Sequence, residues 1–120
     1  MEIRFSNGRD ELNIRLPSRL PGAEEWFDAP VRLRVGELSF GYSGSFQTRD
    51  FRDLFRRAEA AGAAGSEWRF DCLEGHLEFT VSKHDSLGHF RLDVRIEQPP
   101  TVIMTAFVLD SIDLERVLTP

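Results

Sequence analysis

The stretch LEFTVSKHDSLGHFRLDVRI, residues 77–96, consists of two runs in which apolar and polar residues alternate. Strict alternation is typical of strands that bury one face, and the segment between the two runs is rich in turn-forming residues. We therefore predict an antiparallel hairpin with one apolar face turned toward a helix. That face would carry Leu77, Phe79, Val81, Phe90, Leu92 and Val94.

The register of this hairpin follows from its turn. If Asp85 and Gly88 are the first and fourth residues of a type I turn, where those residue types are favoured, Glu78 lies opposite Arg95. A shorter, two-residue turn would set Glu78 against Asp93, and like charges directly opposed destabilise a sheet. The charges therefore favour the first register.

The same reasoning extends outward along the chain. Alternation predicts a hairpin at residues 2–16 and strands near 31–35, 38–40, 68–70 and 102–109, with a turn or bulge at Gly36 and a proline-bounded loop at 17–30. Apolar residues spaced i, i+3, i+4 and i+7 predict one long helix that begins with Thr48 as its N-cap and ends at Gly62. The closing residues DSIDLERVL predict a short C-terminal helix. Because helix and strands are segregated, we predict an α+β fold, in which an antiparallel sheet of about 6–8 strands, partly curved or sandwich-like, packs on one main α-helix.

Length and composition indicate a single domain over residues 1–120. The 20 acidic residues outnumber the 15 basic ones, and the net charge of −5 argues against a nucleic-acid partner and favours a basic protein partner. The single cysteine, Cys72, allows no disulfide framework, and no stretch approaches the ~20 apolar residues of a membrane helix. We expect a cytoplasmic protein that does not engage membranes.

The three histidines do not predict a metal site. In the preferred register His84 and His89 face each other at the tip of the hairpin, while His76 lies eight residues back along the strand. Eight residues span about 26 Å, far more than a coordination sphere. Cys72 is farther still, so we expect no bound metal.

The stretch GYSGS, residues 41–45, nearly matches the G-x-S-x-G nucleophile elbow, but it ends in Ser45 and lacks a surrounding parallel sheet. Ser43 would act as a nucleophile only if a histidine met it in space.

The loop PGAEEWFDAP, residues 21–30, is the most distinctive segment. Its two aromatic side chains either fill the end of the core or anchor a binding surface. Both interpretations are correct if one ring points inward and the other outward. Surrounding acids would steer a basic partner. The candidate partner-binding residues are Glu24, Glu25, Trp26, Phe27 and Asp28.

In order along the chain, the segments IRFSNGRDELNIRL, VRLRV, LSFGYSGSF, DFRDLFRRAEA, WRFDCLEGHLEFTV, HFRLDVRIE and FVLDSIDLERVL resemble the WapI-type immunity proteins of bacterial contact-dependent toxin systems. The resemblance spans nearly the whole chain. It implies a non-enzymatic cytoplasmic protein, without catalytic residues or cofactor, that binds and neutralises a cognate toxin. Many such toxins are nucleases with basic substrate sites, which an acidic protein can occupy.

Two alternatives remain open from the residues alone. One is a small-ligand-binding α+β domain with an apolar cavity, and the other is a hydrolase that uses Ser43.

Overall fold

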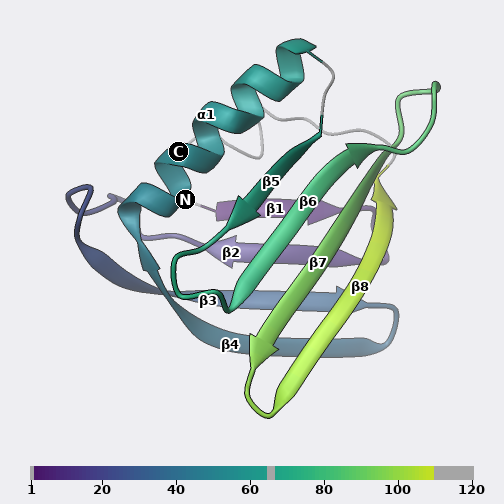
Figure 1. Ribbon diagram of the computed structural model, residues 1–120. Helices are drawn as coiled ribbons and strands as arrows, with labels where there is room; N and C mark the ends of the chain where they lie inside the picture. The colour runs from purple at the N-terminus through teal and green to yellow at the C-terminus, as the bar shows by residue number, and fades with distance from the viewer. Residues whose placement is uncertain (1, 65–66, 110–120) are drawn as a thin grey trace.

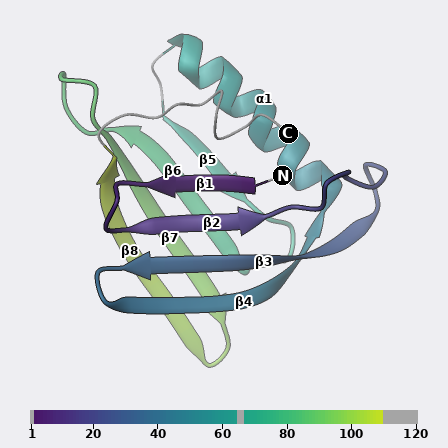
Figure 2. The same ribbon diagram turned by 180° about the vertical axis from the view of Figure 1, so that it is seen from behind.

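The computed structural model describes residues 2–64 and 67–109, which form two four-stranded antiparallel sheets and one helix (Figure 1). The first sheet has the order β1-β2-β3-β4 and the second the order β5-β6-β7-β8. The elements are β1 (Glu2–Ser6), β2 (Glu11–Arg15), β3 (Trp26–Val35), β4 (Leu38–Gln47), α1 (Thr48–Ala64), β5 (Trp68–Asp71), β6 (Leu77–Lys83), β7 (Phe90–Gln98) and β8 (Thr101–Leu109). Seen from either side, the strands of one sheet cross behind those of the other (Figures 1 and 2).

The core lies between the two sheets. Each strand alternates, so each sheet has one apolar face, and the two apolar faces cover one another. The Phe79 ring of β6 lies 5.3 Å from that of Phe5 in β1 and 5.0 Å from that of Phe70 in β5. The buried face of the β6–β7 hairpin is therefore turned toward the opposite sheet, and the prediction that it faces the helix was wrong.

The predicted fold class was also wrong, because the protein is mostly β. A single helix cannot cover the apolar area that eight alternating strands present, whereas a second sheet can. α1 instead lies beside β5 at one side of the sandwich (Figure 1). The side chain of Phe51 enters the core from there, 5.1 Å from the ring of Phe46 and 5.3 Å from that of Phe70. The predicted C-terminal helix lies outside the described residues.

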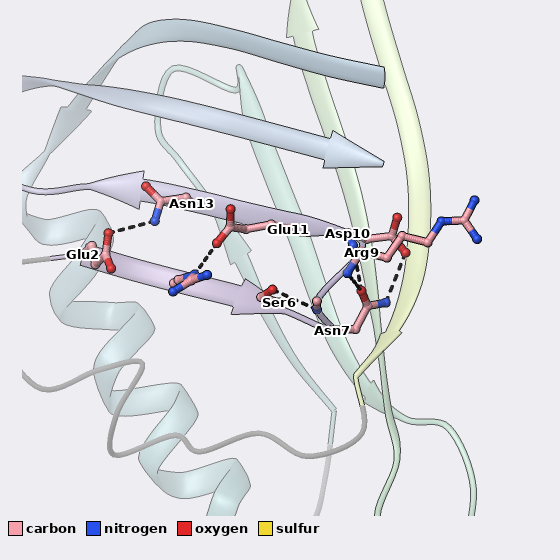
Figure 3. A network of polar contacts seen from close by, with 9 residues as sticks. Glu2, Ser6, Asn7, Arg9, Asp10, Glu11 and Asn13 are labelled. Carbon is pink, nitrogen blue, oxygen red and sulfur yellow. Dashed lines mark hydrogen bonds and ion pairs between the residues drawn. The ribbon is translucent and has the colours of Figure 1, made fainter. Parts of the chain in front are cut away.

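The predicted register of the β6–β7 hairpin agrees with the structure. Glu78 pairs with Arg95, as the charge argument required. β1 and β2 form the N-terminal hairpin, whose turn is held by the side chain of Asn7: its Oδ1 accepts hydrogen bonds from the backbone of Arg9 and Asp10 (Figure 3). Gly36 has a φ of 60°, as the first central residue of the two-residue β3–β4 turn requires.

The loop predicted for residues 17–30 is shorter, because β3 begins at Trp26. Pro30 is accommodated inside β3 because the β2–β3 ladder ends one residue away, at the pair of Ile14 and Val31. No sheet hydrogen bond is needed from the missing N–H of Pro30. The predicted strand began only after Pro30, at residue 31, because a proline was taken as its boundary, whereas β3 begins at Trp26.

α1 begins at Thr48, but Thr48 does not act as the predicted N-cap. Among the described residues the buried Thr48 hydroxyl has no hydrogen-bond partner, so it does not cap the helix. Asp50 accepts a hydrogen bond from the backbone N–H of Gln47 instead, which is one half of a capping box. At the other end, α1 continues two residues past Gly62, since a glycine lowers helix propensity without ending a helix by itself.

Within the described part of the chain, no helix has the length and apolar character needed to cross a membrane.

Candidate functional site

The predicted partner-binding residues lie where β3 begins, beside the start of α1. Trp26 pairs with Gln47, the last residue of β4, and Asp28 pairs with Ser45. The loop before β3 closes onto the helix, because the carbonyl groups of Ala23 and Glu25 accept hydrogen bonds from the backbone N–H groups of Arg49 and Thr48. These contacts satisfy two of the donors that a helix start leaves free.

The two aromatic residues of this segment point in opposite directions. Successive side chains of a strand alternate between its faces, so Phe27 points inward and Trp26 outward. The ring of Phe27 lies 5.7 Å from that of Phe51 and 6.2 Å from that of Phe46. Trp26 is 44% exposed. Phe27 thus fixes the strand, and Trp26 is the residue of the pair that a partner can reach.

Two of the three acids help to hold the loop. The carboxylate of Glu24 forms an ion pair with Arg49 and accepts a hydrogen bond from Nε2 of Gln47 at 3.3 Å. Glu25 folds back, and its Oε2 accepts a hydrogen bond from the backbone of Gly22 at 3.0 Å. Both glutamates are exposed, and exposed ion pairs contribute little to stability, so their carboxylates remain accessible to a partner.

Asp28 is also exposed and points outward on the same face as Trp26. We refer to Glu24, Glu25, Trp26 and Asp28 together as the Trp26 surface.

A hollow of about 570 Å³ lies at the edge of β4, the strand that pairs with β3. It contains Ser45, the strand partner of Asp28. Its rim carries two further carboxylates, Glu74 from the β5–β6 turn and Glu97 from β7, the latter 3.1 Å from a guanidinium nitrogen of Arg95. Glu74 and Glu97 come from distant segments of the chain, and only the packing of the sheets places them in one hollow with Ser45, so no local pattern of residues predicts this grouping.

Charge is distributed unevenly along the outer face of β3. Trp26 and Asp28 occupy its first half, whereas the exposed side chains of Arg32 and Arg34 occupy its second half. A basic partner would meet attraction at the first half and repulsion at the second. On the outer face of β3, the acidic character that the composition predicts is therefore confined to the first half of the strand.

His76 is buried and tied to the other sheet rather than to Ser43. Its Nδ1 lies 2.8 Å from the Tyr42 hydroxyl and its Nε2 lies 2.9 Å from the carbonyl oxygen of Ser45. Both ring nitrogens are thus engaged, and neither can activate Ser43 in this arrangement. Burial raises the pKa of the Cys72 thiol, which keeps it in its unreactive protonated form.

The histidines lie apart, as the hairpin register predicted. His76 precedes β6, and His84 follows its far end, where the backbone N–H of His84 donates to the carbonyl of His89. The Nδ1 atom of His89 is 2.6 Å from a carboxylate oxygen of Asp85. In residues 2–64 and 67–109, no three His, Cys, Asp or Glu side chains are grouped closely enough to hold a metal ion.

The interior also bears on the small-ligand alternative. The rings of Phe5, Phe46, Phe51, Phe70 and Phe79 pack against one another between the sheets and fill the centre of the described structure. This packing gives no support to an apolar ligand cavity.

Comparison with known proteins gives one family. No curated protein and no solved structure matches the chain. The model of the immunity protein WapI-like family matches residues 2–119, almost the entire sequence. The chain belongs to the WapI-like family of immunity proteins.

Proposed function

We propose that this immunity protein acts in the cytoplasm, where it binds a cognate toxin domain and neutralises it by protein–protein contact without catalysis. Membership of the immunity family supports binding of a toxin in general. The observation on which the choice of surface rests is the exposed Trp26, next to the half-buried Phe27, whose ring packs against Phe51. A large aromatic side chain on a rigid strand is the type of residue that dominates binding energy at interfaces.

The charges around Trp26 support a basic partner. Glu24, Glu25 and Asp28 are exposed and flank Trp26 in the sequence, and Glu74 adds a further carboxylate in the hollow that contains Ser45, the strand partner of Asp28. Such a region speeds encounter with a positively charged protein and orients it, while the aromatic residue slows its release. Toxins that cleave nucleic acids present this kind of basic surface.

The experiment begins with a pull-down from the source bacterium at low and high salt, using the wild type and Trp26→Ala as baits. The captured toxin domain is then used to measure association and dissociation rates. We expect Trp26→Ala to speed dissociation by about 30-fold, the effect of losing a hot spot worth roughly 2 kcal/mol. The matched control is Leu38→Ala, which removes an exposed apolar side chain at the other end of the β3–β4 hairpin.

Steering is tested separately with Asp28→Asn, since Asp28 is the acid of the Trp26 surface that does not hold the loop. Its control is Glu37→Gln, an exposed acid in the β3–β4 turn. We expect Asp28→Asn to slow association and reduce its salt dependence, and Glu37→Gln to leave both unchanged. If Trp26→Ala and Asp28→Asn bind the toxin as the wild type does, the Trp26 surface is not the interface.

A further inference from the structure

The edge strand β8 differs from the other three edge strands of the sandwich. Its sequence TVIMTAFVL contains no charged residue, proline or glycine, the features that normally protect an exposed edge. Its outward side chains are apolar, with Val102 50% and Met104 74% exposed. The outward residues of the other edges are polar, charged or small: Glu2, Arg4 and Ser6 in β1, Ser39, Gly41 and Ser43 in β4, and Arg69 and Asp71 in β5.

The backbone of β8 also has a free side. In an antiparallel strand the N–H and C=O of one residue point to the same neighbour, and successive residues alternate. Glu97 in β7 donates its N–H to His76 on the β6 side, so Gln98 and every second residue before it face β8. Gln98 pairs with Thr101, which places the backbone groups of Val102, Met104, Ala106 and Val108 on the unpaired edge.

One end of this edge is already covered. The side chain of Asn7, at the tip of the β1–β2 hairpin, donates a hydrogen bond to the carbonyl of Val108 at 3.0 Å. Within the described residues no such contact reaches Val102, Met104 or Ala106, and β8 lies at the margin of its sheet in both views (Figures 1 and 2). The accessible part of the edge therefore runs from Val102 to Ala106.

The charges next to β8 indicate which kind of strand fits this edge. On the neighbouring strand β7, Arg91 is paired with Asp93 and Arg95 with Glu97, so the outward face beside β8 has no net charge. A basic toxin would find no attraction there, unlike at the Trp26 surface. An approaching strand would meet neither repulsion nor an unpaired charge at β8 if it carried no charge itself and if the ion pairs on its neighbouring strand were balanced in the same way.

We infer that β8 pairs with β8 of a second copy of this chain, which forms a two-fold symmetric dimer with a continuous eight-stranded sheet. The two-fold axis passes at Met104, so that Met104 faces Met104 and Val102 of one copy faces Ala106 of the other. This register joins the free backbone groups on both strands. It also places the exposed apolar side chains of the two copies side by side, which removes them from water. The Trp26 surface belongs to the other sheet, so dimerisation does not depend on the proposed toxin contact.

The first test is the oligomeric state of the full chain, measured by sedimentation velocity over a series of concentrations. We expect the wild type to approach twice the 13.7 kDa chain mass, with a dissociation constant on the order of 10 to 100 µM because a strand pair is a small interface. Met104→Lys would place two lysines against each other at the axis and weaken the dimer by about tenfold or more. Leu38→Lys is the matched control on the β4 edge, at a similarly exposed leucine, and should dimerise as the wild type does.

A charge-swap experiment then tests the position of the axis. Met104→Glu alone should be monomeric for the same reason as Met104→Lys, whereas an equimolar mixture of the two should form a heterodimer. Because Met104 is exposed, neither variant should unfold the chain, and circular dichroism checks this. A wild type that stays monomeric at about 1 mM overturns the inference. A Met104→Lys variant that dimerises as strongly as the wild type also overturns it. So does a monomeric wild type whose Met104→Lys variant no longer binds the toxin, because the β8 edge would then be a toxin contact. A mixture that remains monomeric contradicts the two-fold axis at Met104.

Discussion

The hydroxyl of Tyr42 in β4 lies 2.8 Å from Nδ1 of His76, the residue before β6, and so links the two sheets. The Nε2 atom of the same ring lies 2.9 Å from the carbonyl oxygen of Ser45. A carbonyl can only accept, so Nε2 carries the hydrogen and Nδ1 accepts from Tyr42. Burial, with a smaller contribution from Cys72, raises the pKa of Tyr42, so its hydroxyl keeps the proton that it donates.

Removing this hydroxyl should destabilise the fold. Tyr42→Phe leaves the buried Nδ1 of His76 without a donor, and we expect a loss of about 1 to 3 kcal/mol in the free energy of unfolding. Urea denaturation followed by fluorescence measures the change. Ser43→Ala, at the neighbouring exposed position, is the control and should stay within about 0.5 kcal/mol of the wild type. Equal stability of Tyr42→Phe and Ser43→Ala would show that the Tyr42–His76 contact is not important for the fold.

A second prediction concerns Gly44, whose place in the GYSGS stretch is explained by packing. A Cβ atom at Gly44 would lie 2.6 Å from Cε1 of His76 and 2.9 Å from Cε2 of Phe46. Gly44→Ala should therefore cost about 1 to 3 kcal/mol of stability through overpacking. Gly41→Ala in the same strand is the control, because its Cβ would meet its nearest neighbour at an ordinary 3.6 Å. Thermal unfolding that ranks Gly41→Ala as the more damaging change would contradict this account.

A third prediction concerns Asp50, which ties the start of α1 to the β5–β6 turn. Its Oδ2 accepts from the backbone N–H of Gln47 at 3.0 Å and its Oδ1 from that of Leu73 at 3.2 Å. Asp50→Ala should lower the free energy of unfolding by about 1 to 3 kcal/mol, because both donors lose a charged acceptor. Asp53→Ala, which removes only an exposed pair with Arg56, should cost far less. Chemical denaturation at neutral pH compares the two variants.

The pH dependence of the Asp50 effect has a definite sign. Burial raises the pKa of Asp50, and the hydrogen bonds from Gln47 and Leu73 offset this only in part. The native state thus holds the proton to higher pH than the unfolded chain, and stability falls as the pH rises through the interval between the two pKa values. Relative to Asp50→Asn, which does not titrate, the wild type should lose stability over that interval. A rise there would show that the sign is wrong.

The opposite sign is expected for Asp85 at the tip of the β6–β7 hairpin. The side-chain hydrogen bond from His89 lowers the pKa of Asp85, helped by backbone hydrogen bonds from Leu87 and His89. The contribution of Asp85 to stability should be present above its unfolded pKa and lost as the pH falls through the lower folded value. NMR titration of the carboxyl carbon should give a midpoint below the ordinary pKa of an aspartate side chain. His89→Ala should move that midpoint upward, and an unchanged midpoint would exclude His89 as the main cause.

Features that are set by residues close together in the chain could be predicted from the sequence. The pairing of Glu78 with Arg95 followed from the turn residues between them and from the cost of opposing Glu78 to Asp93. The turn at Gly36 followed from the change of alternation at that position. In both hairpins the segments that pair are separated by a short turn, so local chemistry alone sets the register.

What covers each apolar face was decided only by the tertiary structure. Alternation shows that a strand buries one side, but the pattern of Phe79 is the same whether its ring meets a helix or Phe5 of another sheet. The second hydrogen bond of Asp50, from the backbone of Leu73 in a distant turn, was likewise decided by the tertiary structure. Glu74 lies in one hollow with Ser45, the strand partner of Asp28, because β4 and the β5–β6 turn meet in space. Contacts between segments far apart in the chain depend on the packing of whole faces, which no local pattern of residues specifies.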